Sequence, residues 1–476
     1  MTAKTTIADL VAPGRPSGVG IRLSEVFASG KRLEANAYGI AAREAVSLMV
    51  ARGLSLRPVF GTPDALCHEA HNAFRFRRIY VDARHGVPFL SSADIINMRP
   101  EADAFLSRKL TKNLDRLLVR HFDVLISCSG TVGNVALAGA SVSHFALSQD
   151  AIRARTSSPE QAGYLTAFLR SRFGRTQLTG SAYGSVIVHI EPEHLSRVLV
   201  PALGDSLEQH IGALMCNASS LRDLANVKLA TADDQLRRSL RLPRLDDLST
   251  RAHLGSSISS RHLQGRLEGS YHSETARAAY RYVTSELDVP TLPLGSPEIA
   301  SEIRAVTKFR KRVYVNRGGI PLLSSRQLFQ VDPVGVKQLA KKIHAKDMAE
   351  ISLEEGMIAI TSSGTIGKVQ IVPSYMHGWA ANQHSIRVTA SALERGYLFA
   401  WLNSEFGRRL ITRHAYGSVI LEIDRQMLSS VPVPLPGVDV QQRIGALVDE
   451  ANRLRDEAWT SEQTAIHRIE DAILTD

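Results

Sequence analysis

The 476 residues exceed the usual size of one hydrophobic core, so we expect about two to four domains. Hydrophobic residues make up 44% of the chain and charged residues 22%, which excludes the disordered, collagen-like and membrane classes. Lysine and arginine outnumber aspartate and glutamate by 57 to 47, and the resulting net charge of +10 favours a polyanionic partner.

Cysteine usage and the N-terminus bear on the cellular compartment. Cys67, Cys128 and Cys216 lie far apart and form no CxxC pair, so we expect neither a disulfide framework nor a metal site. Pro13 and Gly14 precede any apolar stretch of signal-peptide length, and no run of about 18 apolar residues occurs. These features predict a cytoplasmic protein without a membrane span, and nothing indicates a cofactor.

The first globular unit is expected over residues 22–203, after an N-terminal lead over 1–21. Alternating or β-branched runs predict strands near 78–81, 124–127 and 186–190, with a turn over 129–133. Helical spacing from Tyr164 to Phe173 adds a helix, so the unit is expected to be an α+β domain.

A helix follows this unit over residues 204–241. Its apolar residues alternate spacings of four and three, which is the a/d pattern of a coiled coil. The residues of this seam are Leu207, Ile211, Leu214, Ala218, Leu221 and Ala225. An amphipathic helix packed on its own domain is the alternative.

The second half of the chain repeats the first, as a domain over 242–437 and a helix over 438–476. Arg32-Leu-Glu34 recurs at Arg266, Arg77-Arg-Ile-Tyr-Val81 recurs as Lys311-Arg-Val-Tyr-Val315, and Ala182-Tyr-Gly-Ser-Val-Ile187 recurs at Ala415. The matches are collinear over half the chain, so we interpret them as an internal duplication.

The second helix repeats the heptad seam of the first. Its residues are Val440, Ile444, Leu447, Ala451, Leu454 and Ala458. We therefore expect two tandem-duplicated α/β domains, joined and followed by long helices that pack as an antiparallel coiled coil and relate the domains by a pseudo-twofold axis. About 35 residues of helix would span roughly 50 Å.

Several motifs now point to a known family. They are Gly86-Val-Pro-Phe-Leu-Ser-Ser92 with Gly319-Ile-Pro-Leu-Leu-Ser-Ser325, Ile126 to Gly133 with Ile360 to Gly367, Asn382-Gln383, the Pro-Leu-Pro436 exit, and Gln441-Gln442. In this order and duplicated, they make the chain resemble the specificity subunits of type I restriction-modification systems. The first copy departs from the pattern at Ser148-Gln149 and at residues 200–203.

The resemblance implies two target-recognition domains with spacer helices. Such subunits bind a bipartite double-stranded DNA target and hold two methyltransferase subunits, and restriction (motor-nuclease) subunits join in some assemblies. They perform no chemistry themselves. Related phage-defence methylation systems use similar subunits.

The Ser-Gly-Thr-x-Gly loops suggest phosphate contacts, because glycine amides and hydroxyls can approach an oxyanion closely. A structural hairpin turn is the alternative, since no Walker lysine follows. The serine and threonine candidates for DNA binding in these loops and in the neighbouring motifs are Ser91, Ser92, Ser129, Thr131, Ser324, Ser325, Ser363 and Thr365.

Basic clusters occur at the same place in both units, which favours a grip on DNA phosphates over an ordinary charged strand edge. These clusters are Arg75, Arg77 and Arg78 in the first unit and Lys308, Arg310, Lys311 and Arg312 in the second.

Choice of DNA sequence is expected where the two halves differ, because identical readers would recognise identical half-sites. The first unit carries Arg108, Lys109, Lys112, Arg116 and Arg120, and the second carries Lys337, Lys341, Lys342 and Lys346. Arginine is suited to guanine in the major groove, whereas lysine more often serves as a point charge on phosphate.

Two further patterns have competing interpretations. Tyr183 and Tyr416, each before Gly-Ser, could stack on DNA or donate to phosphate, although packed turn tyrosines are commoner. Cys67-His-Glu-Ala-His71 resembles a metal motif, but its histidines lack the HExxH spacing, so a surface helix is expected.

An enzyme of its own is not expected. The chain shows no Asn/Asp-Pro-Pro-Tyr/Phe methyltransferase loop, no glycine-rich cofactor turn and no Asp…Glu-x-Lys nuclease arrangement. The remaining alternative to a DNA reader is a duplicated non-catalytic scaffold that binds protein partners.

Overall fold

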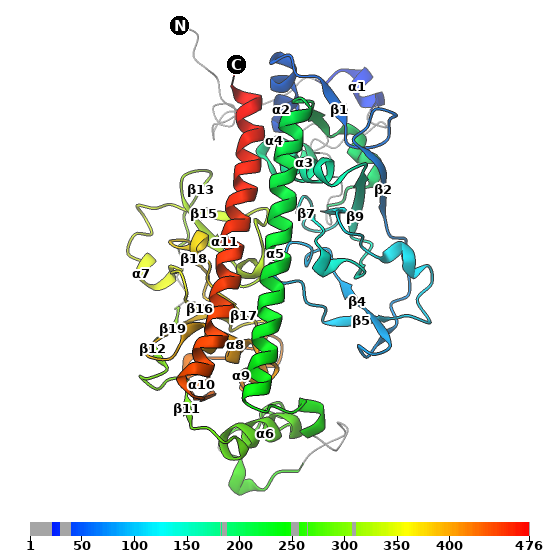
Figure 1. Ribbon diagram of the computed structural model, residues 1–476. Coiled ribbons are helices and arrows are strands. Elements are labelled where there is room, and N and C mark those ends of the chain that lie inside the picture. Colours follow the sequence, from blue (N-terminus) through cyan, green and yellow to red (C-terminus); the bar gives the residue numbers. More distant parts are fainter. Residues whose placement is uncertain are drawn as a thin grey trace. The chain divides into compact units, whose positions relative to one another are not determined.

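The computed structural model describes residues 21–28, 40–180, 182, 188–248, 257–263, 265–306 and 311–475. The chain divides into two compact units (Figure 1). Unit 1 comprises Met1–Asp223, Val331–Val334 and Glu457–Asp476, and unit 2 comprises Leu224–Gln330 and Gly335–Asp456. The division therefore cuts through both long helices.

Unit 1 contains two four-stranded sheets, in the orders β2-β9-β6-β7 and β3-β5-β4-β8, and a two-stranded sheet of β1 and β10. The pairs are antiparallel except for β4 and β8, which run parallel. The strands are β1 (Leu56–Pro58), β2 (Cys67–Asn72), β3 (Tyr80–Val81), β4 (Gly86–Leu90), β5 (Ala104–Ser107), β6 (Val124–Ser127), β7 (Val135–Leu137), β8 (Ala146–Leu147), β9 (Ala151–Thr156) and β10 (Leu199–Pro201).

Helices cover and connect these sheets. They are α1 (Leu23–Ala28), α2 (Ile40–Ala51), the 3-10 turns η2 (Leu114–Leu117) and η3 (Ala140–Val142), α3 (Pro159–Arg170), α4 (Arg172–Gly180), the 3-10 turn η4 (Pro192–Arg197) and the long helix α5 (Asp205–Ser239).

Unit 2 repeats the sheets of unit 1 in the same order. The four-stranded sheets are β12-β19-β16-β17 and β13-β15-β14-β18, and β11 pairs with β20. This equality of topology confirms the predicted duplication of an α/β domain. The strands are β11 (Thr291–Pro293), β12 (Ala300–Ala305), β13 (Tyr314–Val315), β14 (Ile320–Leu323), β15 (Lys337–Leu339), β16 (Ile358–Thr361), β17 (Val369–Ile371), β18 (Ala380–Ala381), β19 (Ser385–Ala390) and β20 (Pro432–Pro434).

The helices of the second copy correspond largely to those of the first. They are the 3-10 turns η5 (Leu245–Leu248) and η6 (Ser260–His262), α6 (Glu274–Arg281), the π-helical turn η7 (Tyr282–Glu286), the 3-10 turn η8 (Gln327–Phe329), α7 (Met348–Ile351), the 3-10 turn η9 (Ser374–Met376), α8 (Arg395–Asn403), α9 (Glu405–Thr412), α10 (Arg425–Ser429) and α11 (Val438–Leu474).

The helix expected from Tyr164 to Phe173 is two helices that meet at a serine. Ser171 stands between α3 and α4, and its Oγ donates to the carbonyl of Phe168 while it accepts from the amide of Gly174. Ser404 makes the same two bonds between α8 and α9. Each serine hydroxyl therefore satisfies a free carbonyl at the C-terminus of one helix and a free amide at the N-terminus of the next.

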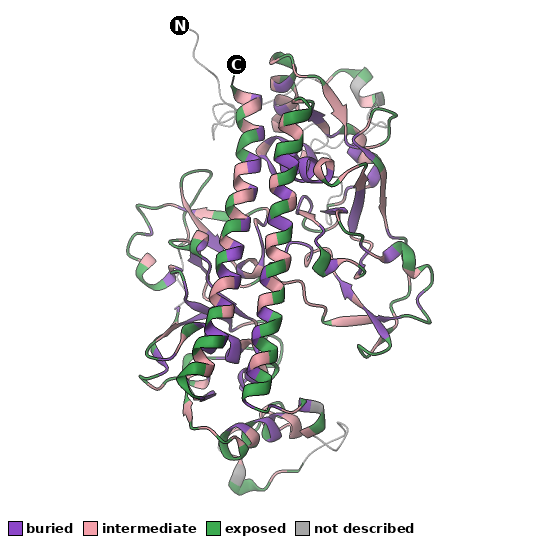
Figure 2. Cartoon of the chain, viewed as in Figure 1, coloured by how far each residue is buried: buried purple, intermediate pink, exposed green. Residues whose placement is uncertain are grey.

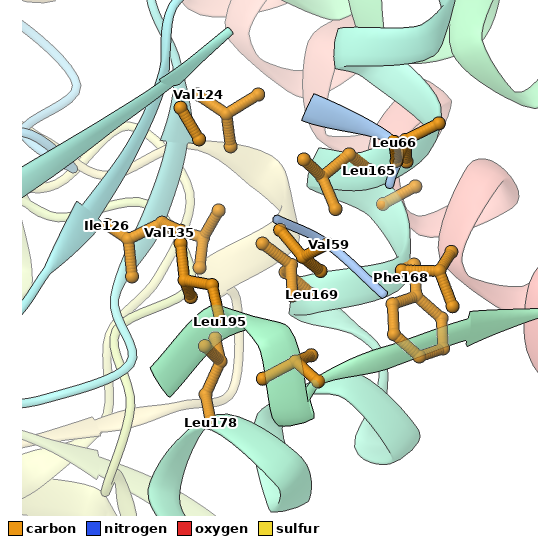
Figure 3. Packing of buried hydrophobic residues seen from close by; sticks show 14 of the residues in the cluster. Val59, Leu66, Val124, Ile126, Val135, Leu165, Phe168, Leu169, Leu178 and Leu195 are labelled. Atoms are coloured by element: carbon orange, nitrogen blue, oxygen red, sulfur yellow. The ribbon is translucent and has the colours of Figure 1, made fainter. Parts of the chain in front are cut away.

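The core of unit 1 lies between a β-sheet and the helices α3 and α4, as Figure 3 shows for Val124, Ile126, Leu165, Phe168 and Leu178. These side chains are fully buried. The last turns of α11 belong to the same cluster, through the buried side chains of Ala465, Ile469 and Ile473.

The helices α5 and α11 pack against each other in both units. In unit 1, Ser461 Oγ donates to the carbonyl of Leu214 at 2.8 Å, and in unit 2, Lys228 pairs with Glu450 at 2.9 Å. The residue number of the partner on α11 decreases from 461 to 450 as the number on α5 increases from 214 to 228, so the two helices are antiparallel. Figure 2 shows buried positions recurring along both helices, and the fully buried seam residues are Ile211, Ala218, Ala225, Ile444, Ala451 and Ala458. The predicted helix pair is confirmed.

Each long helix is also attached closely to its own domain. A Cβ on Gly163 of α3 would collide with the backbone of Gly212 on α5, and Gly396 of α8 meets Gly445 of α11 in the same way. A Cβ on Gly212 would likewise meet the backbone of Glu160, whereas a Cβ on Gly445 would meet only the side chain of Glu394, so the close approach depends on glycine most strictly at the first crossing.

Two of the expected local structures are wrong. Residues 67–71 form most of strand β2 rather than a surface helix, because Ala70 and His71 lie in a ladder with β9. The strand expected over 186–190 is absent from its described part, where His189 makes an isolated bridge to Ser129. In the described residues, no helix is long and apolar enough to cross a membrane.

Candidate nucleic-acid interface

The parallel strands β4 and β8 bring two polar turns to one edge of their sheet. The amide of Ser148 donates to the carbonyl of Leu90 at 3.0 Å, which places residues 148–149 beside Ser91 and Ser92. In unit 2, the amide of Asn382 donates to the carbonyl of Leu323 at 2.9 Å, which places residues 382–383 beside Ser324 and Ser325.

The Ser-Gly-Thr-x-Gly loop reaches the same edge in each unit. It connects the antiparallel strands β6 and β7, and the amide of Cys128 donates to the carbonyl of Asp150 at 2.9 Å. Ser362 and His384 form the equivalent bond at 3.0 Å. We call this assembly the loop junction, which comprises residues 91–92, 128–133 and 148–150 in unit 1, and 324–325, 362–367 and 382–384 in unit 2.

The glycine amides of the loop are already used within the protein. Gly130 donates to Val188 at 3.1 Å and Gly133 to Ser127 at 3.1 Å, and Gly364 donates to Leu421 at 2.9 Å. These amides therefore do not form the phosphate cradle that glycine-rich loops can provide, and the hairpin interpretation of the loop holds for the backbone. Exposed Thr131 and Thr365 and half-buried Ser129 remain candidates through their hydroxyls, whereas the hydroxyl of half-buried Ser363 donates to Glu422 Oε1 at 3.4 Å.

The first serine of each β4-type turn is engaged locally. The amide and hydroxyl of Ser91 both donate to Asp94, and those of Ser324 both donate to Gln327 at 3.0 Å. These bonds shape the turns at the junction. Ser92 and Ser325 lie half-buried beside them.

One arginine of each basic cluster lies at the junction, where it binds a glutamine. Arg78 Nη2 donates to Gln149 Oε1 at 3.2 Å, and its guanidinium lies 5.2 Å from the centre of the Phe89 ring. In unit 2, Arg312 Nη2 donates to Gln383 Oε1 at 2.7 Å. The same pair therefore stands at the same place in both units, although the sequence had suggested only its arginine as a binding residue.

The other members of the basic clusters are placed less specifically. Arg75, Arg77 and Lys311 are exposed on the segments before β3 and β13. Lys308 and Arg310 lie outside the described residues.

Residues 301–458 match the family model for the type I restriction modification DNA specificity domain. These residues therefore belong to a type I specificity domain. The match extends from β12 into α11 and includes the loop junction of unit 2. Because the sheets of unit 1 have the same strand order, the first half is a second copy of the same fold. The family expected from the sequence motifs is thereby confirmed.

Solved structures of related proteins also align with most of the chain. The S subunit of a type I restriction-modification system from M. genitalium aligns at 12% identity and a TM-score of 0.33, covering 88% of this chain and 98% of that one. The HsdS subunit from Thermoanaerobacter tengcongensis aligns at 14% identity and a TM-score of 0.27, covering 87% and 99%. No curated protein sequence matches the chain.

Most of the remaining basic candidates lie away from the loop junction in both units. Gly86 pairs with Ser107 while Phe89 pairs with Ala104, so Arg108 and Lys109 follow β5 at the end of the sheet opposite Ser91. The structure therefore brings together the shared candidates but not these. Lys112, Arg116, Arg120 and Lys346 are likewise exposed in the segments beyond.

Strand register shows that part of this basic stretch is shared rather than divergent. Leu106 pairs with Tyr80 and Leu339 pairs with Tyr314, so Arg108-Lys109 and Lys341-Lys342 occupy equivalent positions. The two specificity domains differ there in the type of cation. Lys337 has no basic counterpart, and it pairs across from Leu322 near the junction, with its Nζ 5.0 Å from the centre of the Tyr314 ring.

Of the two tyrosine candidates, Tyr416 lies beside the junction of unit 2. Tyr416 forms a small hairpin with Glu422, in which each amide donates to the other's carbonyl. Burial and the nearby carboxylates of Glu422 and Asp424 raise the pKa of Tyr416, so it is a neutral donor at physiological pH. Tyr183 lies outside the described residues.

Among the residues that the structure describes, no group of three or more histidine, cysteine, aspartate or glutamate side chains could hold a metal ion. His71 of the CHEAH stretch instead contacts Glu69 at 3.1 Å, and Glu69 binds Arg155 at 2.6 Å. These residues belong to an ion-pair network on β2 and β9.

Proposed function

We propose that this chain is the non-catalytic specificity subunit of a type I restriction-modification or related phage-defence system, and that it recognises a bipartite double-stranded DNA target. The observation that carries the proposal is the loop junction. It is built twice, with the same arginine–glutamine pair, on domains of the type I DNA specificity family.

The residues common to both copies are assigned to the DNA backbone. Arg78 and Arg312 supply charge at the junction, and the hydroxyls of Ser129, Thr131, Ser363 and Thr365 are short donors beside them. Such contacts give affinity and orientation without sequence choice. The exposed arginines and lysines before β3 and β13 extend this role.

Sequence choice is assigned to the positions where the copies differ chemically. Arg108 in one domain and Lys341 in the other occupy equivalent positions. The planar guanidinium of arginine can bind guanine with two parallel hydrogen bonds, whereas the ammonium of lysine acts as a point charge. Lys337 adds a cation to the second domain only.

The partners follow from the family. We propose that the chain holds two methyltransferase subunits, with a restriction subunit joining in some assemblies, in the cytoplasm where DNA and these partners would meet.

Salt dependence of binding tests the DNA-reading role. Affinity for a mixed-sequence duplex is expected to fall linearly on a log–log plot against salt, because bound cations release counterions from phosphates. Arg78→Ala and Arg312→Ala should each lower that slope by about one. Arg238→Ala, which removes an exposed helix arginine paired with Asp234, is the matched control. A flat salt response would reject the proposal.

Methylation tests the identity of the system. The complex is co-purified with the products of neighbouring genes, and the methylome of cells that express it is sequenced. An interrupted two-part motif should be methylated. If none is, the restriction-modification role fails.

A duplicated scaffold that binds proteins is the second candidate, and an exposed apolar hairpin favours it. Val419 is 93% exposed and Ile420 60% exposed, at the tip between Tyr416 and Glu422. Exposed aliphatic side chains of this kind often mark protein contacts. Val419→Ser with Ile420→Ser should reduce co-purification of partners and leave the salt slope unchanged, whereas a loss of DNA affinity would assign the tip to DNA.

A further inference from the structure

Each specificity domain contains a buried arginine at the same place in its sheet. Arg153 on β9 and Arg387 on β19 are 0% and 1% exposed. A guanidinium is rarely buried so fully unless its charge is compensated. We therefore expect these two guanidinium groups to form hydrogen bonds that an apolar side chain could not form.

The partners of these arginines are backbone carbonyls, and they are equivalent in the two domains. Arg153 donates to Leu117 at 2.7 Å, to Leu147 at 2.8 Å and to Ala151 at 3.5 Å. Arg387 donates to Ile351 at 3.2 Å, to Ala381 at 2.5 Å and to Ser385 at 3.3 Å. The two copies differ in the sequences around these acceptors, yet both keep the same three hydrogen bonds. This indicates that the bonds have a function in both domains.

Those carbonyls belong to three separate parts of the domain. Leu117 ends η2, which closes the basic segment that begins at Arg108, and Ile351 ends α7, which closes the segment that begins at Lys341. The second carbonyl ends the short strand β8 or β18, next to the loop junction. One guanidinium thus connects the basic segment, the junction strand and the central strand of the other sheet.

Burial lowers the pKa of both arginines to about 10, so each is still charged at neutral pH. A charged guanidinium forms stronger bonds to carbonyls than a neutral donor would, and its planar fork holds two acceptors in a fixed geometry. Lysine has one nitrogen and cannot reproduce that bridge.

We propose that Arg153 and Arg387 are positioning residues for DNA recognition, each of which holds the basic segment of its own domain, 108–117 or 341–351, in register with the loop junction. The inference rests on the proposed function. It predicts that each arginine affects one half of the bipartite target only.

The first test is amide hydrogen exchange of the full chain without DNA. Arg153→Lys should speed exchange in residues 108–117 only, and Arg387→Lys in 341–351 only. Arg155→Met is the matched control, because Arg155 lies on the same strand but is paired with Asp123 and Glu69. Unchanged exchange, or faster exchange throughout the domain, would overturn the positioning role.

The second test uses the complex with its methyltransferase subunits and duplexes altered in one half of the methylated motif. Arg153→Met should reduce discrimination at one half by about tenfold, the scale of one lost base contact, and Arg387→Met at the other half. The salt slope should not change. If either methionine variant fails to fold, the lysine variant takes its place in this measurement.

The outcomes separate the two claims. If the unaltered complex shows no sequence-selective binding, the proposed function fails. If that complex is selective but each variant weakens both halves equally, the proposed function stands and the positioning inference is wrong.

Discussion

The two units join their long helices by different chemistry. In unit 1, Glu462 of α11 binds Arg170 of α3 at 2.9 Å and Arg222 of α5 at 2.8 Å, all in a largely buried site. At the equivalent positions, unit 2 has Asn403, Arg455 and Leu229. The duplication has therefore kept the loop junction alike while the helix contacts diverged.

A second acid extends the network in unit 1. Asp332 binds Arg170 at 3.2 Å and also Arg175, and its backbone has a positive φ of 46°. Aspartate tolerates this conformation better than most residues. The position of the first copy that corresponds to Asp332 by strand register is Arg99, so this carboxylate occurs in one copy only. Unit 1 thus has two acids in this network, and unit 2 has neither of them at the equivalent positions.

The largest effect is expected from removal of the central acid. Glu462→Gln should lower the free energy of unfolding of unit 1 by about 3–5 kcal/mol, because it removes the buried counter-charge of Arg222 and one of the two counter-charges of Arg170. Urea unfolding monitored by hydrogen exchange measures it. Glu450→Gln, which breaks the more exposed pair with Lys228, should cost less than about 1 kcal/mol. Equal effects would contradict the comparison.

Acid should weaken unit 1 more than unit 2 through the same residue. Burial alone would raise the pKa of Glu462, but Arg170 and Arg222 outweigh it and lower that pKa to about 2. A carboxyl whose pKa is depressed on folding stabilises the fold above its ordinary pKa of 4.5, and that stability is lost as the pH falls toward 2. Unfolding measured across this window should show the loss, and Glu462→Gln should lack it.

The helix crossings should respond unequally to the same substitution. In Gly212→Ala, the new Cβ would meet the backbone of Glu160, whereas in Gly445→Ala it would meet the side chain of Glu394, 2.5 Å from Cγ. A side chain can move aside more easily than a helix. Thermal unfolding should show a loss of about 1–3 kcal/mol for the first and less for the second. A larger effect at Gly445 would reverse this interpretation.

The smallest effects on stability are expected at Asp223 and Asp456, which make equivalent contacts in the two units. Asp223 accepts from the amides of Ala140 and Ser141, and Asp456 accepts from those of Ser374 and Tyr375. Asp223→Ala and Asp456→Ala should each cost about 1 kcal/mol or less in chemical denaturation, since each removes two hydrogen bonds to largely exposed amides that water can replace. Clearly different costs would show that these anchors have diverged as well.

Much of the fold could be predicted from patterns that recur along the chain. The duplication is visible as matches at a fixed offset, and the structure shows it as equal strand order in the two units. The heptad seams are visible as apolar residues at spacings of three and four, and the structure shows them as buried faces of α5 and α11. The break between α3 and α4 could not be predicted in this way, because the hydroxyl of Ser171 interrupts an otherwise helical pattern. Residues 67–71 were likewise ambiguous, since a five-residue run shows little period.

The candidate site was predicted in part. Arg78 and Ser129 were singled out by their position in the repeat, and the structure places both at the loop junction. Gln149 was not, because its partner became visible only when β8 was found parallel to β4. The direction of β5 also decided that Arg108 lies away from Ser91, and strand direction cannot be read from composition or spacing.

The last turns of α11 set a condition on how this protein can be made. Ala465, Ile469 and Ile473 complete the core of unit 1, and the carbonyl of Leu474 accepts from Arg52 at 2.8 Å. During synthesis, the ribosome delivers these residues only after all of the second domain. The first domain to emerge therefore completes its core only after α11 has been synthesised, and part of that core stays uncovered until then.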